Sequence, residues 1–143
     1  ATAEWPARLQ RLTGRLAAQL PPGWELWLDG GHNPGGGAAM AEHFANWADA
    51  PIHLIVGMKK AKDTTESLRP LIPLVATLWA VSEPGQYLAL PVEDIIAATQ
   101  GVARPGPTIA EALAQLPPSP RARVLIWGSL YLAGEALKAD SAA

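Results

Sequence analysis

Residues 26–47 read LWLDGGHNPGGGAAMAEHFANW, and in this stretch an apolar run passes through a glycine-rich turn into a helical pattern. Asn33 is a favourable helix N-cap, and Pro34 suits the first position of a helix. The stretch therefore predicts a buried strand that ends near residue 30 and a helix that begins at Pro34. Apolar residues then recur at the spacing of one helix face, namely Ala41, Phe44, Ala45 and Ala48.

Three further apolar runs resemble the first one and predict a set of buried strands, at 25–30, 52–58, 76–82 and 123–129. Such short, nearly continuous runs are typical of parallel strands with helices on both faces. Helices are predicted between and after them, at 64–72 with Thr64 or Thr65 as cap, 91–101, 108–116 with Thr108 as cap, and 129–139. The alternation indicates an α/β fold, a three-layer Rossmann-like domain with a mostly parallel sheet and helices on both faces.

The flanking segments complete this prediction. A strand near 8–12 is expected to pair with 25–30 and to form one antiparallel strand at the N-terminal edge of the sheet. The proline-rich stretches 84–91 and 104–107 are expected to be exposed connectors. The 143 residues are enough for one compact domain with its own core.

Composition and the terminal sequence indicate which partners, bonds and locations to expect. The formal net charge is −2 with no basic field, which argues against a nucleic-acid partner. No cysteine is present, so disulfides and thiolate metal sites are excluded and a cytoplasmic location is expected. No apolar run approaches the roughly 20 residues of a membrane helix, and the N-terminus lacks a signal-peptide pattern. Because the chain does not begin with methionine, it is expected to be a piece of a longer protein.

Polar clusters follow three of the predicted strands, at 29–33, 57–63 and 128–131. Ligands of open parallel sheets bind beyond the carboxyl ends of the strands, where these clusters should meet. A glycine-rich turn into a helix favours an anion; His32 would add a donor or proton shuttle, and Asp29 could accept from a ribose hydroxyl. The glycines could instead form only a tight turn, with Asp29 as the cap of the helix, and spacing leaves both interpretations open.

Other motifs are weaker. The turn spells neither G-x-x-x-x-G-K-[ST] nor G-x-G-x-x-G, and no H-x-x-x-H pair suggests a metal site. His43 and His53 are expected to be structural. Ser129 lacks the second glycine of G-x-S-x-G and is expected to be a helix N-cap. Two groups stay open: Lys59, Lys60 and Lys62 are a solvated loop or face a phosphate, and Trp5, Trp24 and Trp47 are core or mark a surface for a missing neighbour.

Four motifs occur in order along nearly the whole chain: WPARLQ (5–10), LDGGHNP (28–34), VGMKKAKD (56–63) and GSLYLAGE (128–135). Together they resemble the C-terminal domain of the folylpolyglutamate synthase/dihydrofolate synthase family, within the Mur ligase superfamily. Three departures are visible. Gly31 replaces the usual alanine, which should be harmless in a turn. Ala7 replaces the usual glycine before Arg8, and the KKA segment differs from the commoner acidic or leucine-containing loop.

The resemblance implies ATP-dependent amide-bond formation, in which L-glutamate attacks an acyl phosphate of folate or dihydropteroate. Arg8 would contact an ATP phosphate and Asp29 the ribose. His32 would be the catalytic residue and would line the glutamate and acyl-phosphate region, and Ser129 and Tyr131 would hold glutamate. ATP and Mg²⁺ are the implied cofactors. The phosphate loop, the magnesium ligands and the folate pocket would belong to an N-terminal ATPase domain, a partner that this chain lacks, so the isolated chain is expected to be inactive.

Three alternatives remain from the sequence. One is a free-standing Rossmann-like module that binds a nucleotide or another anion. Another is the C-terminal domain of a cell-wall Mur ligase, whose corresponding turn usually reads differently. The third is a non-catalytic interaction domain that docks a partner through Trp5, Trp24 and its helix faces.

Overall fold

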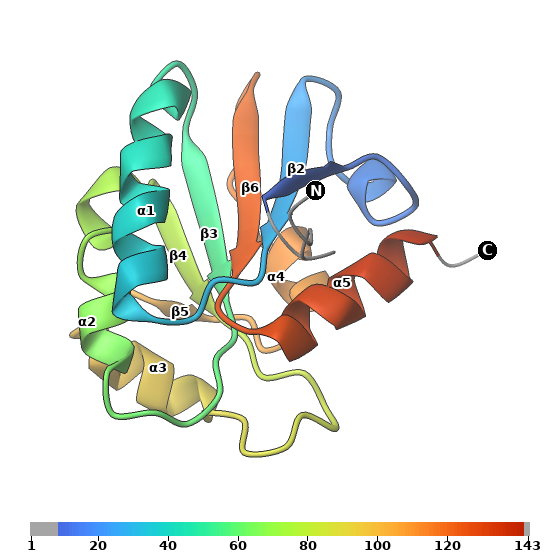
Figure 1. Cartoon of the computed structure of the whole chain (residues 1–143). Coiled ribbons are helices and arrows are strands. Elements are labelled where there is room, and N and C mark those ends of the chain that lie inside the picture. Colours follow the sequence, from blue (N-terminus) through green and yellow to red (C-terminus); the bar gives the residue numbers. More distant parts are fainter. Residues whose placement is uncertain (1–8, 142–143) are drawn as a thin grey trace, which may run out of the picture.

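The computed structural model describes residues 9–141, which form one six-stranded sheet with the strand order β1-β2-β6-β3-β4-β5 (Figure 1). All neighbouring strands run parallel except β1, which is antiparallel to β2 with Gln10 opposite Leu28. The predicted parallel sheet and its antiparallel N-terminal edge are confirmed. The strands are β1 (Gln10–Leu12), β2 (Trp24–Asp29), β3 (Ile52–Val56), β4 (Thr77–Ala80), β5 (Arg104–Pro105) and β6 (Ala122–Trp127).

Helices cover both faces of this sheet, which confirms the three-layer architecture (Figure 1). One face carries α1 (Pro34–Phe44), α2 (Thr64–Leu68) and α3 (Val92–Ala98), and the other carries α4 (Ile109–Ala114) and α5 (Leu130–Ser141). Three short 3-10 helices lie in the connections: η1 (Ala17–Gln19), η2 (Ala45–Trp47) and η3 (Ile72–Leu74).

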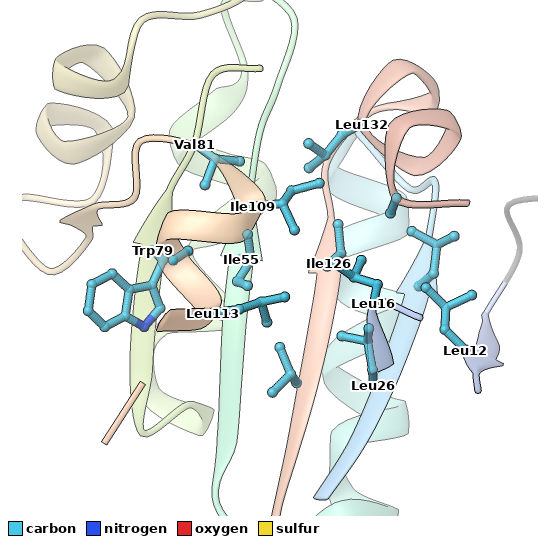
Figure 2. Packing of buried hydrophobic residues seen from close by; sticks show 14 of the residues in the cluster. Leu12, Leu16, Leu26, Ile55, Trp79, Val81, Ile109, Leu113, Ile126 and Leu132 are labelled. Atoms are coloured by element: carbon cyan, nitrogen blue, oxygen red, sulfur yellow. The ribbon is translucent and has the colours of Figure 1, made fainter. Parts of the chain in front are cut away.

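Each face of the sheet has its own apolar core. Figure 2 shows Ile109 and Leu113 of α4 and Leu132 of α5 packed toward Ile55 and Ile126 of the central strands. The neighbouring residues along the same strands contribute to the other core, because successive side chains of a strand point to opposite faces. Burial on both faces explains why β3 and β6 are nearly continuous apolar runs.

The buried face of α1 differs from the predicted stripe. Gly37, Met40 and Phe44 are buried and are continued by Trp47 of η2, whereas the predicted positions Ala45 and Ala48 are exposed. The prediction was wrong there because the α-helix ends at Phe44. The chain then tightens into a 3-10 turn, which changes the helical period and buries the large indole instead of the alanines.

Trp24 and Trp47 are core residues and not a free surface. They are 8% and 5% exposed, and Trp24 stacks on His53 at a ring distance of 5.5 Å. The indole N–H of Trp24 donates to the carbonyl of Ser119 at 2.9 Å. The proposed docking role of Trp24 is therefore wrong, while Trp5 lies outside the described residues.

Element boundaries show the remaining differences. The helix predicted at 64–72 is the shorter α2, which has Asp63 as its N-cap residue in place of a threonine cap. It ends at Leu68, with Arg69 still in helical backbone as the C-cap, and Pro70 has no N–H with which to continue the helical hydrogen bonds. The strand β5 lies within the predicted connector 104–107: its two residues are exposed, as expected, but they pair with β4.

The amino ends of the central strands carry the ion pairs of the sheet. Arg123 lies 2.6 Å from a carboxylate oxygen of Asp49 and 3.0 Å from one of Glu25, and Arg121 lies 2.9 Å from Asp49. Hydrogen bonds from Arg123 and then Arg121 lower the pKa of Asp49 to about 2. This charged end lies opposite the carboxyl edge, where the polar clusters are.

Candidate functional site

The polar clusters meet in a pocket of about 430 Å³ at the carboxyl edge of the sheet. The turns after β2, β3 and β6 all contribute to it, which confirms that they converge. The loop after β4 contributes too, although the sequence indicated only an exposed connector there. The pocket is lined by His32, Lys59, Lys60, Ala61, Gln86, Tyr87, Gly128, Ser129, Leu130 and Tyr131.

The turn between β2 and α1 is held by its own side chains. Asp29 accepts a hydrogen bond from the backbone N–H of Gly31 at 2.6 Å, and Asn33 caps α1 by accepting from Gly36 at 2.8 Å. The interpretation of Asp29 as the cap of the helix is therefore wrong, because Asn33 is the cap of α1 and Asp29 bonds within the turn that precedes it. Its side chain is half-buried beside the pocket and does not line it.

His32 is exposed and lines the pocket. Its Nδ1 lies 3.2 Å from the carbonyl oxygen of Gly30. Because a carbonyl only accepts, Nδ1 carries the hydrogen in this bond, and the lone pair of the neutral ring is then on Nε2. This arrangement leaves Nε2 as the atom able to accept a proton from a molecule in the pocket.

The turn between β6 and α5 supplies the other wall. Ser129 accepts from the backbone N–H of Leu132 at 3.0 Å, which confirms its role as a helix cap, and its hydroxyl hydrogen can still be donated. Gly128 has φ +127°, and a Cβ there would lie 2.6 Å from the carbonyl oxygen of Gly57, so only glycine fits. The hydroxyl of Tyr131 donates to the carbonyl of Pro84 at 3.0 Å, which leaves its ring as the lining surface.

The charge of the pocket is positive. Lys59 and Lys60 line it, and none of its lining residues is an aspartate or glutamate. Lys62, by contrast, lines a separate hollow between α2 and α3. The N-terminus of α5, a helix of 12 residues, also points its positive dipole end toward this edge. The arrangement suits a ligand with at least one negative group.

The next two features concern a metal site and the phosphate contact that the resemblance implies. Within residues 9–141, no group of three or more His, Asp or Glu side chains could hold a metal ion. Arg8, for which the resemblance implies a phosphate contact, lies outside the described residues.

The comparisons with known proteins agree with the fold and the motifs. No family model matches the sequence. A folylpolyglutamate synthase from Lacticaseibacillus casei is 29% identical over 135 residues, which are 93% of this chain and 29% of that protein. The chain is similar to folylpolyglutamate synthases.

Solved structures show the same architecture. A Mycobacterium tuberculosis folylpolyglutamate synthase complexed with ADP superposes with a TM-score of 0.77 at 24% identity, over 98% of this chain and 33% of that one. A bifunctional folylpolyglutamate synthase/dihydrofolate synthase with Mn, AMPPNP and L-glutamate bound gives 0.78 at 20% identity, over 96% and 32%. The chain therefore spans about a third of the length of the folylpolyglutamate synthases that it matches.

Gly31, where members of the folylpolyglutamate synthase family usually have alanine, is required by its surroundings. A Cβ at this position would lie 2.5 Å from Nε1 of Trp127 and 3.0 Å from Oδ1 of Asp29. The glycine fits the turn, as expected, whereas an alanine would not fit in this chain, because the indole of Trp127 lies directly beneath it. Trp127 is 1% exposed, and its N–H has no hydrogen-bond partner among the described residues.

The other two histidines are structural, as expected. His53 is 2% exposed, with Nδ1 2.6 Å from the hydroxyl oxygen of Thr77, and burial lowers its pKa. His43 meets the ring of Trp47 edge-on at 4.9 Å. Neither residue lines the pocket. No helix among the described residues is both long and apolar enough to cross a membrane.

Proposed function

We propose that this chain is the C-terminal domain of an ATP-dependent ligase that joins L-glutamate to folate or dihydropteroate through an acyl phosphate. One observation carries the proposal. A single positively charged pocket collects His32, Ser129 and Tyr131 from two distant turns, within a chain that aligns over 93% of its length with a folylpolyglutamate synthase. Those are the residues for which the family resemblance implies contact with glutamate.

The amine of L-glutamate must lose a proton to attack an acyl carbon. Nε2 of His32 is the proton acceptor in this proposal, because Nδ1 donates to Gly30 and holds the ring in the required tautomer. The hydroxyl of Ser129 donates to a carboxylate of glutamate, and the N-terminus of α5 favours the same negative group. These residues position and polarise the reactants.

ATP supplies the phosphoryl group that activates the acceptor carboxylate. Asp29 would hold the ribose beside the pocket, with its carboxylate orientation fixed by the N–H of Gly31. Arg8 would contact a phosphate. The magnesium ligands would come from an ATPase domain that precedes this one, which agrees with the two-thirds of the relatives' length that this chain does not span.

A self-contained nucleotide- or anion-binding module is the second candidate. The observation in its favour is that the whole pocket, with two lysines and no acid, is formed within this one chain. Such a module would bind its ligand tightly without another domain, whereas half of a two-domain cleft would bind weakly.

Calorimetric titration of the chain with MgATP and with L-glutamate separates the two. We expect dissociation constants weaker than roughly 100 μM for each, since the contacts of the ATPase domain would be absent. We also expect no ligase turnover by the chain alone. A submicromolar nucleotide affinity would favour the self-contained module, and turnover by the chain alone would contradict the half-site.

A chimera tests the positive part of the proposal. This chain would replace the matching segment of the Lacticaseibacillus casei folylpolyglutamate synthase, and addition of glutamate to folate and to dihydropteroate would be measured. We expect activity that falls at least 100-fold, on the order of a lost general base, in His32→Ala. His43→Ala, on α1 but outside the pocket, is the matched control and should retain activity. A chimera whose activity is unaffected by His32→Ala would contradict the proposed role.

A further inference from the structure

Trp127, the last residue of β6, carries a buried hydrogen-bond donor that the fold does not use. The side chain is 1% exposed, and its indole N–H has no hydrogen-bond partner among the described residues. Two other buried indoles, those of Trp24 and Trp79, donate to oxygen atoms at 2.9 and 2.8 Å. Because a buried donor without a partner costs about 1–3 kcal/mol, the unpaired N–H of Trp127 requires an explanation.

A carboxylate lies beside this donor on the neighbouring strand. Asp29 is the last residue of β2 and the register partner of Trp127 in the parallel pair of β2 and β6 (Figure 1). Register partners in a parallel pair direct their side chains to the same face of the sheet. The indole belongs to the core on the face that carries α1, so the carboxylate of Asp29 and the indole N–H are neighbours there.

Gly31 leaves open the space between this donor and this acceptor. The position that a Cβ of Gly31 would take lies 2.5 Å from Nε1 of Trp127 and 3.0 Å from Oδ1 of Asp29. Oδ1 already accepts from the N–H of Gly31 at 2.6 Å, and a carboxylate oxygen can accept a second hydrogen bond. A methyl group at position 31 would stand between the indole and the carboxylate. The glycine and the tryptophan therefore complement each other.

We propose that Trp127 is a positioning residue for Asp29: when the turn between β2 and α1 closes on a ligand, the indole N–H donates to the carboxylate across the space at Gly31. This inference rests on the proposed function, in which Asp29 accepts from a ribose hydroxyl. The N–H groups of Gly31 and Trp127 then fix the carboxylate from two sides. Since the indole gains its acceptor only in the closed turn, this hydrogen bond favours the ligand-bound state. Trp127 does not line the pocket, so it acts through Asp29.

The indole ¹H–¹⁵N resonances of the chain report this hydrogen bond directly. The chain has six tryptophans, and loss of a resonance in Trp127→Phe assigns the one that belongs to Trp127. We expect millimolar MgATP to shift the Trp127 indole proton downfield, because a hydrogen bond to a charged acceptor is short and strong. The resonance of Trp79, whose N–H already donates to Thr77, should stay in place.

A nucleotide without ribose hydroxyls is the control for the ligand. 2′,3′-Dideoxy-ATP should leave the Trp127 resonance in place, since it offers Asp29 no hydroxyl hydrogen. An equal shift with the dideoxy nucleotide would overturn the link to Asp29. A stationary Trp127 resonance while MgATP moves the backbone amides of the turn would overturn the hydrogen bond itself.

Kinetics of the chimera give a second measurement. Trp127→Phe keeps an aromatic ring but removes the N–H, so it should raise the KM for ATP about fivefold and leave the KM for L-glutamate unchanged. In the background of Asp29→Ala the same substitution should add nothing, because Trp127 acts only through that carboxylate. Trp79→Phe removes a buried indole away from the turn and should change neither KM. Additive effects of Trp127→Phe and Asp29→Ala, or an equal effect of Trp79→Phe, would overturn the proposal.

The two measurements together distinguish failure of this inference from failure of the proposed function. An active chimera whose KM for ATP is unchanged in Trp127→Phe would refute the role of Trp127 alone. A chimera without ligase activity, together with an MgATP-dependent shift of the Trp127 indole that Asp29→Ala abolishes, would refute the proposed function alone. An inactive chimera and an indole resonance that MgATP does not move would refute both.

Discussion

Gly31 and Trp127 form a steric pair in which the indole excludes any side chain at position 31. Gly31→Ala would bring a methyl group to 2.5 Å from Nε1 of Trp127, so we expect it to destabilise the protein by about 1–3 kcal/mol. Trp127→Leu should remove most of that specific cost and leave only its own loss of packing. A double-mutant cycle of urea unfolding measures the coupling between the two positions.

Gly134 provides the control for this substitution. It lies on the exposed side of α5, and a Cβ there meets no atom within 4 Å. Gly134→Ala should therefore stabilise the protein by about 0.5–1 kcal/mol through its helix propensity. The two glycine substitutions are therefore expected to change the unfolding free energy in opposite directions. Equal changes would argue against the contact with Trp127.

His53 should make the stability depend on pH near neutrality. Burial lowers its pKa from the ordinary value of 6.5, so the folded state keeps the ring neutral while the unfolded state takes up a proton. Stability is then complete above pH 6.5 and falls as the pH drops below it, by at most about 1.4 kcal/mol per pH unit. Asp49 and Glu25 have lowered pKa values and act only at more acidic pH.

Urea unfolding at pH 7.5 and pH 5.5 checks this dependence. The loss of unfolding free energy at pH 5.5 should shrink in His53→Gln and persist in His43→Gln. Persistence in both variants would mean that another group takes up the proton.

The residues that line the pocket were predictable only where the motifs are distinctive. The resemblance selected His32, Ser129 and Tyr131, and the structure places all three in one pocket. Tyr87 could not be found in this way, since it lies in a loop without a motif, and that loop is held at the pocket by bonds to the loop of Lys60 and to Tyr131. The need for Gly31 was also missed, because it depends on a side chain 96 positions away.

At the scale of elements, the caps of two helices can be compared directly. Ser129 caps α5 and Thr108 caps α4, in each case by accepting a backbone N–H. Ser129→Ala and Thr108→Ala should each lower the unfolding free energy by about 1 kcal/mol. Only Ser129→Ala should also weaken L-glutamate binding, measured by NMR titration, since Thr108 is not in the pocket. Equal weakening of L-glutamate binding in both variants would mean that Ser129 acts only as a helix cap.

The residues around each boundary predicted where elements begin better than where they end. Asn33 and Thr108 identified two helix starts correctly because an N-cap acts within three residues of itself. The strand β5 was missed since it has only two residues, one of them proline, and exists through pairing with β4. The 3-10 helices were missed for a similar reason. They lie where the chain reverses direction, and packing against the rest of the protein sets their conformation.

At the scale of the whole molecule, apolar patterning predicted the layers but could not give the strand order. The continuous runs of β3 and β6 imply helices on both faces, and the chain order implies parallel crossovers. Nothing local to β6, however, indicates that the last strand enters between β2 and β3. That insertion is what brings Ser129 beside His32, so the geometry of the pocket depends on a long-range choice of pairing.

The position of β6 between β2 and β3 also predicts how the chain unfolds. The two cores share β3 and β6, in which Ile126 belongs to the core under α4 and α5 while Leu54 and Leu125 belong to the other. Loss of either core should therefore expose the strands that support both, and unfolding should be a single transition. Leu54→Ala and Ile126→Ala should each cost about 2–5 kcal/mol, whereas Leu74→Ala, at a position 46% exposed, should cost much less.

Urea unfolding followed by tryptophan fluorescence and by far-ultraviolet circular dichroism tests this cooperativity. The two signals should give the same midpoint in the parent chain, and the midpoints should move together in both core variants. If Leu54→Ala shifted one signal and left a second transition at the parent midpoint, the two faces would be independent. The central position of β6 would then not couple them, and the pocket at its carboxyl end could lose one wall without the other.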